Sequence, residues 1–274
     1  MADRTIDAGT DVVRLEVVDG IGLITLNRPD RRNALHHEMY APMRAAIEEF
    51  NTADDVGCIV LTGEGSGFCA GGDVRDGRVR EPGAPRPTIE EAGASLLADA
   101  QVARMLHESP KLTIAAVNGP AVGAGLSLAL SCDLRIMARS ATFIPGWGKL
   151  AFSGDFGGTW FLTRLVGPSK ALELLVLNTK VTADEALALG LANRVVDDAE
   201  FPAAWREWAD RFATGPRDAV ALMKQNVQQA LIEPLSTALA AESLRMATSA
   251  RTQDHKEAVR AWMDKREPDF RRGG

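Results

Sequence analysis

A series of apolar segments interrupted by a glycine turn, within residues 112–138, most constrains the fold of this chain. Residues 112–117 and 134–138 are short, continuous apolar runs typical of buried parallel strands, and residues 126–131 form an apolar stretch between them. Parallel neighbours in a sheet are usually joined through a helix, so this order predicts a strand–helix–strand unit. The chain is therefore expected to have an α/β core built from such units.

The first part of the chain predicts a hairpin, followed by further strands and helices. Residues 12–18 alternate apolar and charged side chains, and Asp19-Gly20 turns the chain into a second apolar run at residues 21–26. Asn33 is expected to cap the helix that follows it. The other expected elements are a buried strand at 58–62, helices at 34–50 and 89–107, a short strand at 194–196 and further helices after residue 169. We therefore expect an α/β core over residues 1–200 and a helical region over residues 201–274.

Composition and charge exclude several classes of partner. The net charge of −6 argues against nucleic acid or anionic lipid as the main partner, although the basic cluster Arg28, Arg31 and Arg32 could meet a phosphate. The three cysteines are scattered without CxxC spacing, and the four histidines show no ligand-like pattern. The chain is thus expected to bind no metal.

The expected location is the cytoplasm. Residues 1–11 are polar and acidic, unlike a signal peptide, and the most apolar stretch, residues 113–132, is broken by asparagine, proline and glycine. We therefore predict no membrane span.

Two glycine turns, each following a predicted strand, are the candidate sites of chemistry. They are Gly65-Ser66-Gly67-Phe68-Cys69-Ala70-Gly71-Gly72-Asp73 and Asn118-Gly119-Pro120-Ala121-Val122-Gly123-Ala124-Gly125-Leu126. Glycine leaves the backbone open to a ligand, and a turn that opens into a helix directs free N–H groups outward. Two such groups aimed at one point form an oxyanion hole. The alternative is that the glycines serve only tight turns and close packing. The spacing matches neither a dinucleotide fingerprint nor a P-loop.

These turns and two later blocks resemble the enoyl-CoA hydratase/isomerase (crotonase) superfamily. The first turn is similar to the family's F-x-A-G-x-D segment and the second to its V-N-G-x-A-x-G-x-G segment. The further matching segments are Asn27-Arg28-Pro29, Asn33-Ala34-Leu35, Gly157-Gly158-Thr159, Leu165-Val166-Gly167, Thr182-Ala183-Asp184-Glu185-Ala186 and Gly190-Leu191-Ala192-Asn193-Arg194-Val195-Val196. The resemblance implies a spiral of ββα units over residues 1–200 that binds acyl-CoA. It also implies C-terminal helices that assemble a homotrimer or a dimer of trimers.

The resemblance also assigns roles to individual residues. The backbone amides of Ala70 and Ala124 would donate hydrogen bonds to the thioester oxygen. No separate cofactor is implied, because coenzyme A is part of the substrate. The residues implied to bind the substrate or its coenzyme A are Asn27, Arg28, Arg32, Ala34, Ala70, Gly71, Gly72, Asp73, Val74, Gly123 and Trp147.

The chain departs from the typical hydratases at both of their catalytic glutamates. Ser127 stands at the first of these positions and Trp147 at the second, while a carboxylate stands instead at Asp155. This resembles the single-aspartate branch that includes ring-opening epoxyphenylacetyl-CoA isomerases and enoyl-CoA isomerases. Asp155 is therefore the predicted catalytic residue.

One carboxylate suits isomerisation better than hydration. A single base can take a proton from one carbon and return it to another while the oxyanion hole holds the enolate, whereas adding water calls for two acid–base groups. The apolar neighbours Trp147, Phe152 and Phe156 would raise the pKa of Asp155. Three alternatives remain: a hydratase using Asp155, an aspartate nucleophile as in aryl-CoA dehalogenases, and a non-catalytic acyl-CoA-binding protein.

Overall fold

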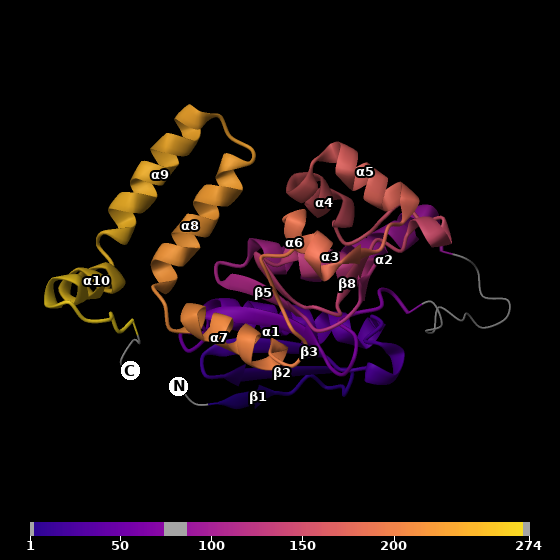
Figure 1. Cartoon of the computed structure of the whole chain (residues 1–274), viewed down its shortest axis with the longest axis horizontal. Helices are drawn as coiled ribbons and strands as arrows, with labels where there is room; N and C mark the ends of the chain where they lie inside the picture. The colour runs from indigo at the N-terminus through magenta and orange to yellow at the C-terminus, as the bar shows by residue number, and fades with distance from the viewer. Residues whose placement is uncertain (1–2, 74–86, 271–274) are drawn as a thin grey trace.

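The computed structural model describes residues 3–73 and 87–270, which fold around a mixed seven-stranded sheet (Figure 1). The strand order is β1-β2-β3-β4-β5-β7-β10, with β1, β2 and β3 antiparallel and the neighbours from β3 to β10 parallel. A second sheet has the order β6-β8-β9. The strands are β1 (Arg4–Ile6), β2 (Val13–Val18), β3 (Ile21–Leu26), β4 (Cys58–Gly63), β5 (Leu112–Val117), β6 (Ala121–Val122), β7 (Leu134–Ala138), β8 (Thr142–Ile144), β9 (Val181–Thr182) and β10 (Arg194–Val196).

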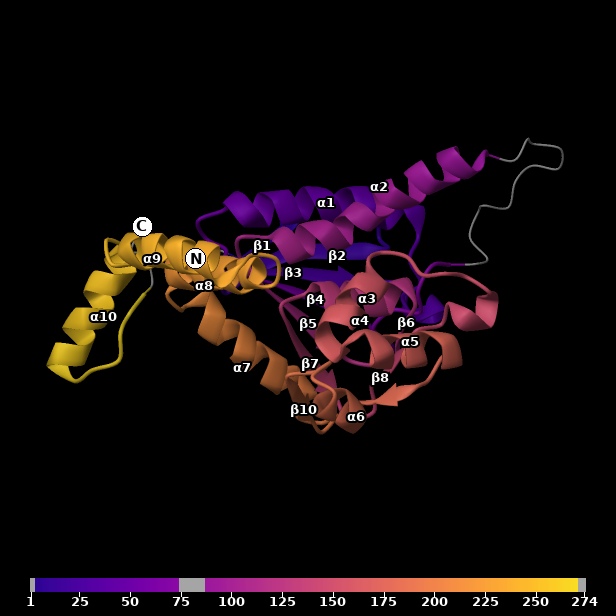
Figure 2. The same ribbon diagram turned by 90° about the horizontal axis from the view of Figure 1, so that it is seen from above.

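Helices cover both faces of the large sheet, with α1 and α2 on one face and α7 packed against β3, β4, β5 and β7 on the other, while α3 to α6 lie around the small sheet (Figure 2). The helices are α1 (His37–Thr52), α2 (Ile89–Glu108), α3 (Ala124–Ser131), α4 (Gly158–Val166), α5 (Pro168–Leu177), α6 (Ala183–Ala188), α7 (Phe201–Ala213), α8 (Arg217–Ala230), α9 (Leu235–Ser249) and α10 (Gln253–Asp264). Within the described part of the chain, none of them combines the length and apolarity that a bilayer crossing requires.

The central strands are parallel and apolar because they are covered on both faces. The strand β4 is buried along nearly its whole length, and so is β5. Helix α2 begins with a capping box in which Thr88 accepts the N–H of Glu91 and the Glu91 carboxylate accepts the N–H of Thr88. The predicted hairpin, the buried strands, the helix near 89–107 and the short strand at 194–196 are all confirmed.

The predicted helix cap at Asn33 is wrong. Helix α1 begins at His37, and its N-cap is His36, whose side chain accepts the N–H of Glu38. Asn33 is fully buried, and its amide group donates to the carbonyl oxygens of Glu64 and Gly67 at 2.9 and 2.7 Å. Asn33 therefore ties the first glycine turn to the chain before α1, a role that a local pattern does not reveal.

The C-terminal helices lie beside the α/β core (Figures 1 and 2). Helix α7 still belongs to the core, since Ala204, Ala209 and Ala213 pack into it. Beyond it, α8 buries only Lys224, and α9 buries no residue. The division near residue 200 stays a prediction, but the extent of burial falls sharply after α7.

Candidate active site

The two glycine turns lie against each other. The N–H of Cys69 donates to the Pro120 oxygen at 3.2 Å, and the N–H of Val122 donates to the Cys69 oxygen at 2.9 Å. A Cβ atom at Gly125 would lie 2.4 Å from that same Cys69 oxygen, so only glycine allows this approach. The glycines therefore serve close packing, and this close packing is also what brings the backbones of the two turns together.

The structure corrects the assignment of Ala70 as an oxyanion donor. The N–H of Ala70 donates to the carbonyl oxygen of Arg32 at 2.9 Å and is therefore already engaged. The N–H of the neighbouring Gly72 is not engaged in this way, because Leu35 bonds to the residues before and after Gly72. The N–H of Leu35 donates to the Gly71 oxygen, and the N–H of Asp73 donates to the Leu35 oxygen. In such a parallel bridge the N–H of Gly72 points away from Leu35.

Gly72 and Ala124 both line the cavity, and their backbone N–H groups have no acceptor among the described residues. Ala124 is the first residue of α3, so its N–H has no intrahelical partner. A Cβ atom at Gly71 would lie 3.7 Å from the nitrogen of Ala124, which shows how closely the two turns meet. The positive end of the α3 dipole adds to the attraction for a negative oxygen.

A cavity of about 830 Å³ lies at the meeting point of these turns. The cavity is lined by six of the predicted binding residues, Ala70, Gly71, Gly72, Asp73, Gly123 and Trp147. It is also lined by Ala124 and Asp155, the other two predicted catalytic positions besides Ala70. Four lining residues that the sequence analysis missed come from α1 and α2: His37, Tyr40, Leu96 and Asp99. The three-residue spacing of Leu96 and Asp99, and of His37 and Tyr40, places each pair on one helix face, which is the only signal that pointed to them.

The predicted coenzyme A residues before α1 do not line this cavity; they are Asn27, Arg28, Arg32 and Ala34. The Arg28 guanidinium pairs with the Asp73 carboxylate at 2.9 Å and donates to the Ala34 oxygen at 2.8 Å. The side chain of Asn27 donates to the Asp11 oxygen. Val74 lies outside the described residues. Contact of these residues with coenzyme A stays a prediction.

Asp155 contacts both Ser127 and Trp147, the two positions at which the typical hydratases are expected to carry glutamate. Its Oδ1 accepts the indole N–H of Trp147 at 2.9 Å, and its backbone oxygen accepts the hydroxyl of Ser127 at 3.0 Å. A Cβ atom at Gly158 would lie 2.4 Å from the Trp147 ring and 2.5 Å from the Ser127 hydroxyl oxygen, so glycine is needed where α4 begins. Burial raises the pKa of Asp155 above its usual value, and the Trp147 hydrogen bond offsets part of this rise.

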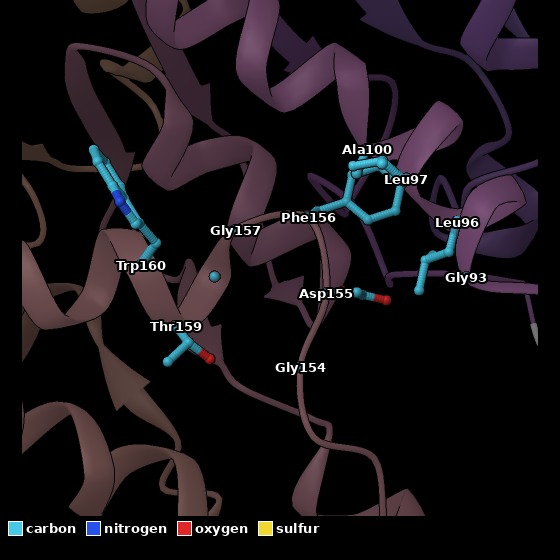
Figure 3. Close-up of a pocket in the computed structure, with 11 residues that line it drawn as sticks. Gly93, Leu96, Leu97, Ala100, Gly154, Asp155, Phe156, Gly157, Thr159 and Trp160 are labelled. Atoms are coloured by element: carbon cyan, nitrogen blue, oxygen red, sulfur yellow. The ribbon is translucent and has the colours of Figure 1, made fainter. Parts of the chain in front are cut away.

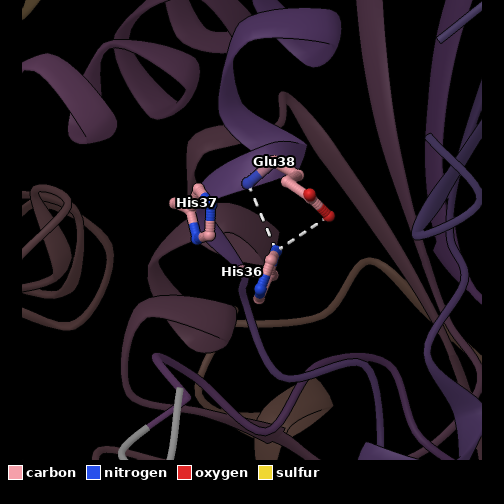
Figure 4. A group of neighbouring side chains, drawn as sticks. All are labelled: His36, His37 and Glu38. Atoms are coloured by element: carbon pink, nitrogen blue, oxygen red, sulfur yellow. Dashed lines mark hydrogen bonds and ion pairs between the residues drawn. The ribbon is translucent and has the colours of Figure 1, made fainter. Parts of the chain in front are cut away.

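A group of possible metal ligands lies at the start of α1. His36, His37 and Glu38 hold three potential ligand atoms within 4.8 Å of one another (Figure 4). The Nδ1 atom of His36 accepts the N–H of Glu38 at 3.3 Å, so this nitrogen already caps the helix. The cluster therefore gives no reason to revise the prediction that the protein binds no metal.

The fold and this arrangement of turns define the class of protein. The sequence model of the enoyl-CoA hydratase/isomerase family matches residues 16–273, and the chain belongs to this family. Its fold accordingly matches that of a solved enoyl-CoA hydratase from Polaromonas sp. JS666, with a TM-score of 0.86 and 30% identity over 94% of this chain and 98% of the other.

Two similar relatives are named for different reactions. The chain is 37% identical to the 1,2-epoxyphenylacetyl-CoA isomerase of Escherichia coli (strain K12), over 93% of this chain and 96% of the relative. It is 35% identical to the short-chain-enoyl-CoA hydratase of Clostridium acetobutylicum, over 93% of this chain and 95% of the relative. The protein is therefore an acyl-CoA enzyme of this family.

Proposed function

We propose that this protein is an acyl-CoA isomerase that shifts a double bond from the 3 to the 2 position, or opens a strained ring, with Asp155 as its acid–base group. The observation that carries the proposal is the environment of this carboxylate. Ser127 and Trp147, which stand where hydratases are expected to carry glutamates, both hydrogen-bond to Asp155. One carboxylate thus occupies the place where hydration calls for two.

The proposed double-bond shift conserves every atom. The ionised Asp155 removes a proton from carbon 2 of the 3-enoyl thioester, and the electron pair spreads over carbon 4 and the thioester oxygen. The N–H groups of Gly72 and Ala124 stabilise that oxygen. Asp155 then delivers a proton to carbon 4, and the double bond stands at position 2. Between the two steps the carboxyl proton exchanges with the solvent. A carboxyl group with a raised pKa suits both steps, since it is a stronger base than an ordinary carboxylate and still returns the proton as an acid.

We also propose that the protein works as a homotrimer or a dimer of trimers. The support is the surface of the C-terminal helices, where large apolar side chains are exposed in the single chain. They include Leu244, Met246, Trp262 and Met263, whose exposed fractions lie between 63% and 81%. Sedimentation equilibrium measures the assembly directly, and a monomer at micromolar concentration would contradict this proposal.

The proposed isomerase activity is tested by following the α-protons of a 3-enoyl-CoA substrate by NMR in heavy water. Wild type is expected to exchange these protons and form the 2-enoyl product. Asp155→Asn should abolish both while leaving the dissociation constant for coenzyme A unchanged. Asp264→Asn, at an exposed carboxylate on α10, is the matched control and should behave as wild type.

The other outcomes distinguish the alternatives. Conversion of a 2-enoyl-CoA to a 3-hydroxyacyl-CoA would identify a hydratase. Binding of acyl-CoA with no proton exchange would identify a non-catalytic protein. Full activity of Asp155→Asn would remove Asp155 from the mechanism.

A further inference from the structure

A second cavity lies on the other side of the segment that carries Asp155. It measures about 430 Å³ and shares four lining residues with the first cavity: Leu96, Gly154, Asp155 and Phe156. Its remaining lining comes from α2 and from the first turn of α4 (Figure 3). Both cavities therefore border the predicted base.

The lining of this second cavity is largely apolar. Helix α2 contributes Leu96, Leu97 and Ala100, and the opposite side contributes the rings of Phe156 and Trp160. Figure 3 shows Asp155 and Leu96 on one side of the cavity and Trp160 on the other. Besides Asp155, the side chain of Thr159 is the polar one among the lining residues. Such a lining suits hydrocarbon and not the charged parts of coenzyme A.

The aromatic wall is held in place from behind. The Arg164 guanidinium lies 3.6 Å from the centroid of the Trp160 ring, and His107 packs edge-on against the same ring with centroids 5.2 Å apart. Phe161 makes a third contact, at 5.1 Å between centroids. Although Trp160 is 41% exposed, these contacts restrict its rotamers, so the cavity wall is preorganised.

We propose that this second cavity is a subsite for the distal apolar end of the acyl group. It rests on the proposed function, which places the thioester oxygen at Gly72 and Ala124 and the reacting carbons beside Asp155. An acyl group that continues past Asp155 reaches the side lined by Leu97 and Trp160. The substrate class is then an acyl-CoA with an apolar chain or ring beyond the reacting carbons, and not the shortest acyl groups.

Gly93 allows this subsite to be filled without disturbing the site. It lines the second cavity and not the first, and a Cβ atom there would meet no heavy atom of the described residues within 4 Å. Gly93→Trp should therefore fill the space between α2 and α4. Gly93→Ala controls for the loss of glycine, and Ala94→Trp places the same bulk on an adjacent, exposed position of α2.

The experiment measures dissociation constants of saturated thioesters by calorimetry, so that it does not depend on turnover. Each buried methylene strengthens binding about fourfold. Octanoyl-CoA and phenylacetyl-CoA should bind Gly93→Trp at least about tenfold more weakly than wild type, while butanoyl-CoA and both control variants stay within about twofold. Circular dichroism and retained butanoyl-CoA binding establish that the variant is folded.

Equal effects on octanoyl-CoA and butanoyl-CoA, or no effect on either, would overturn the subsite. Should Gly93→Trp fail to fold, the smaller Gly93→Leu gives the same comparison with a smaller shift. A failure of isomerase activity with the predicted binding selectivity intact would reject the proposed function and leave the apolar subsite standing.

Discussion

Replacing Trp147 by phenylalanine tests whether its indole N–H tunes the acid–base group. The substitution removes the donor that lies 2.9 Å from Oδ1 of Asp155 and keeps an aromatic ring in the buried site. Since the bond stabilises the ionised carboxylate, its loss should raise the pKa of Asp155 further above its usual value.

The size of the shift follows from the partners. A hydrogen bond to a charged group contributes about 1.5–3 kcal/mol, and the partial solvent access of this half-buried carboxylate favours the lower end. One pKa unit corresponds to about 1.4 kcal/mol, so the expected shift is about one unit upward. On the acid side of the profile, the ionised fraction should then fall about tenfold.

The assay is kcat/KM for 3-enoyl-CoA isomerisation as a function of pH, because its acid limb reports the pKa of the base in the free enzyme. In Trp147→Phe the acid limb of the profile should move about one unit to higher pH. The plateau value of kcat/KM should fall by a smaller factor than kcat/KM on the acid limb. Trp205→Phe, at a tryptophan of α7 that lines neither cavity, is the control and should leave the limb in place. An unchanged limb, or one displaced to lower pH, would refute the role of the indole N–H.

Three further variants test the site and its support. Because the pKa of Asp155 is raised in the folded state, the stability that this group contributes is fully present below its unfolded pKa of about 4 and is lost as the pH rises through the folded pKa. Asp155→Asn should therefore have a Tm at or above that of wild type at pH 7, and the difference should shrink toward pH 4. A lower Tm of the variant at pH 7 would contradict this. Gly158→Ala should lower the free energy of unfolding by about 1–3 kcal/mol in urea titrations, because the new Cβ overlaps Trp147 and Ser127, and an unchanged midpoint would show that the site relaxes. Lys224→Met should cost about 3 kcal/mol in the same assay, the lower end for a buried pair, since it leaves the partly buried Asp133 carboxylate, 2.7 Å from the Lys224 ammonium, without its cation. Asp133→Asn in the same chain should recover part of the loss, and full additivity of the two changes would contradict the coupling.

Much of the architecture follows from local sequence pattern. The apolar runs that became β4, β5 and β7 are continuous because these strands are buried on both faces. Alternation marks β2, the first strand of the hairpin, because one of its faces is partly exposed. The turn at Asp19-Gly20 has positive φ at both residues, as the hairpin requires. The short strands β1, β6, β8 and β9 were missed, since two or three residues carry too little periodicity to be recognised.

The sequence likewise predicted one part of the candidate site and not another. Sequence pattern marked both glycine turns, and the family resemblance marked Asp155 and the absence of glutamate at Ser127 and Trp147. It could not tell that Leu35 pairs beside Gly72, or that the N–H of Ala70 is taken by Arg32. Which amide remains available depends on partners distant in the chain, and no local spacing encodes them.

The sequence by itself determined that this chain forms an α/β core with two glycine turns and a lone acidic residue in a loop rich in glycine. Only the tertiary structure decided that the N–H of Gly72 is available, that Trp147 bonds to Asp155, and that α2 and α4 line a second apolar cavity. The physical reason is range: strand, turn and helix preferences arise between near neighbours in the chain. Hydrogen-bond pairing and cavity shape arise between segments that meet only when the core has closed.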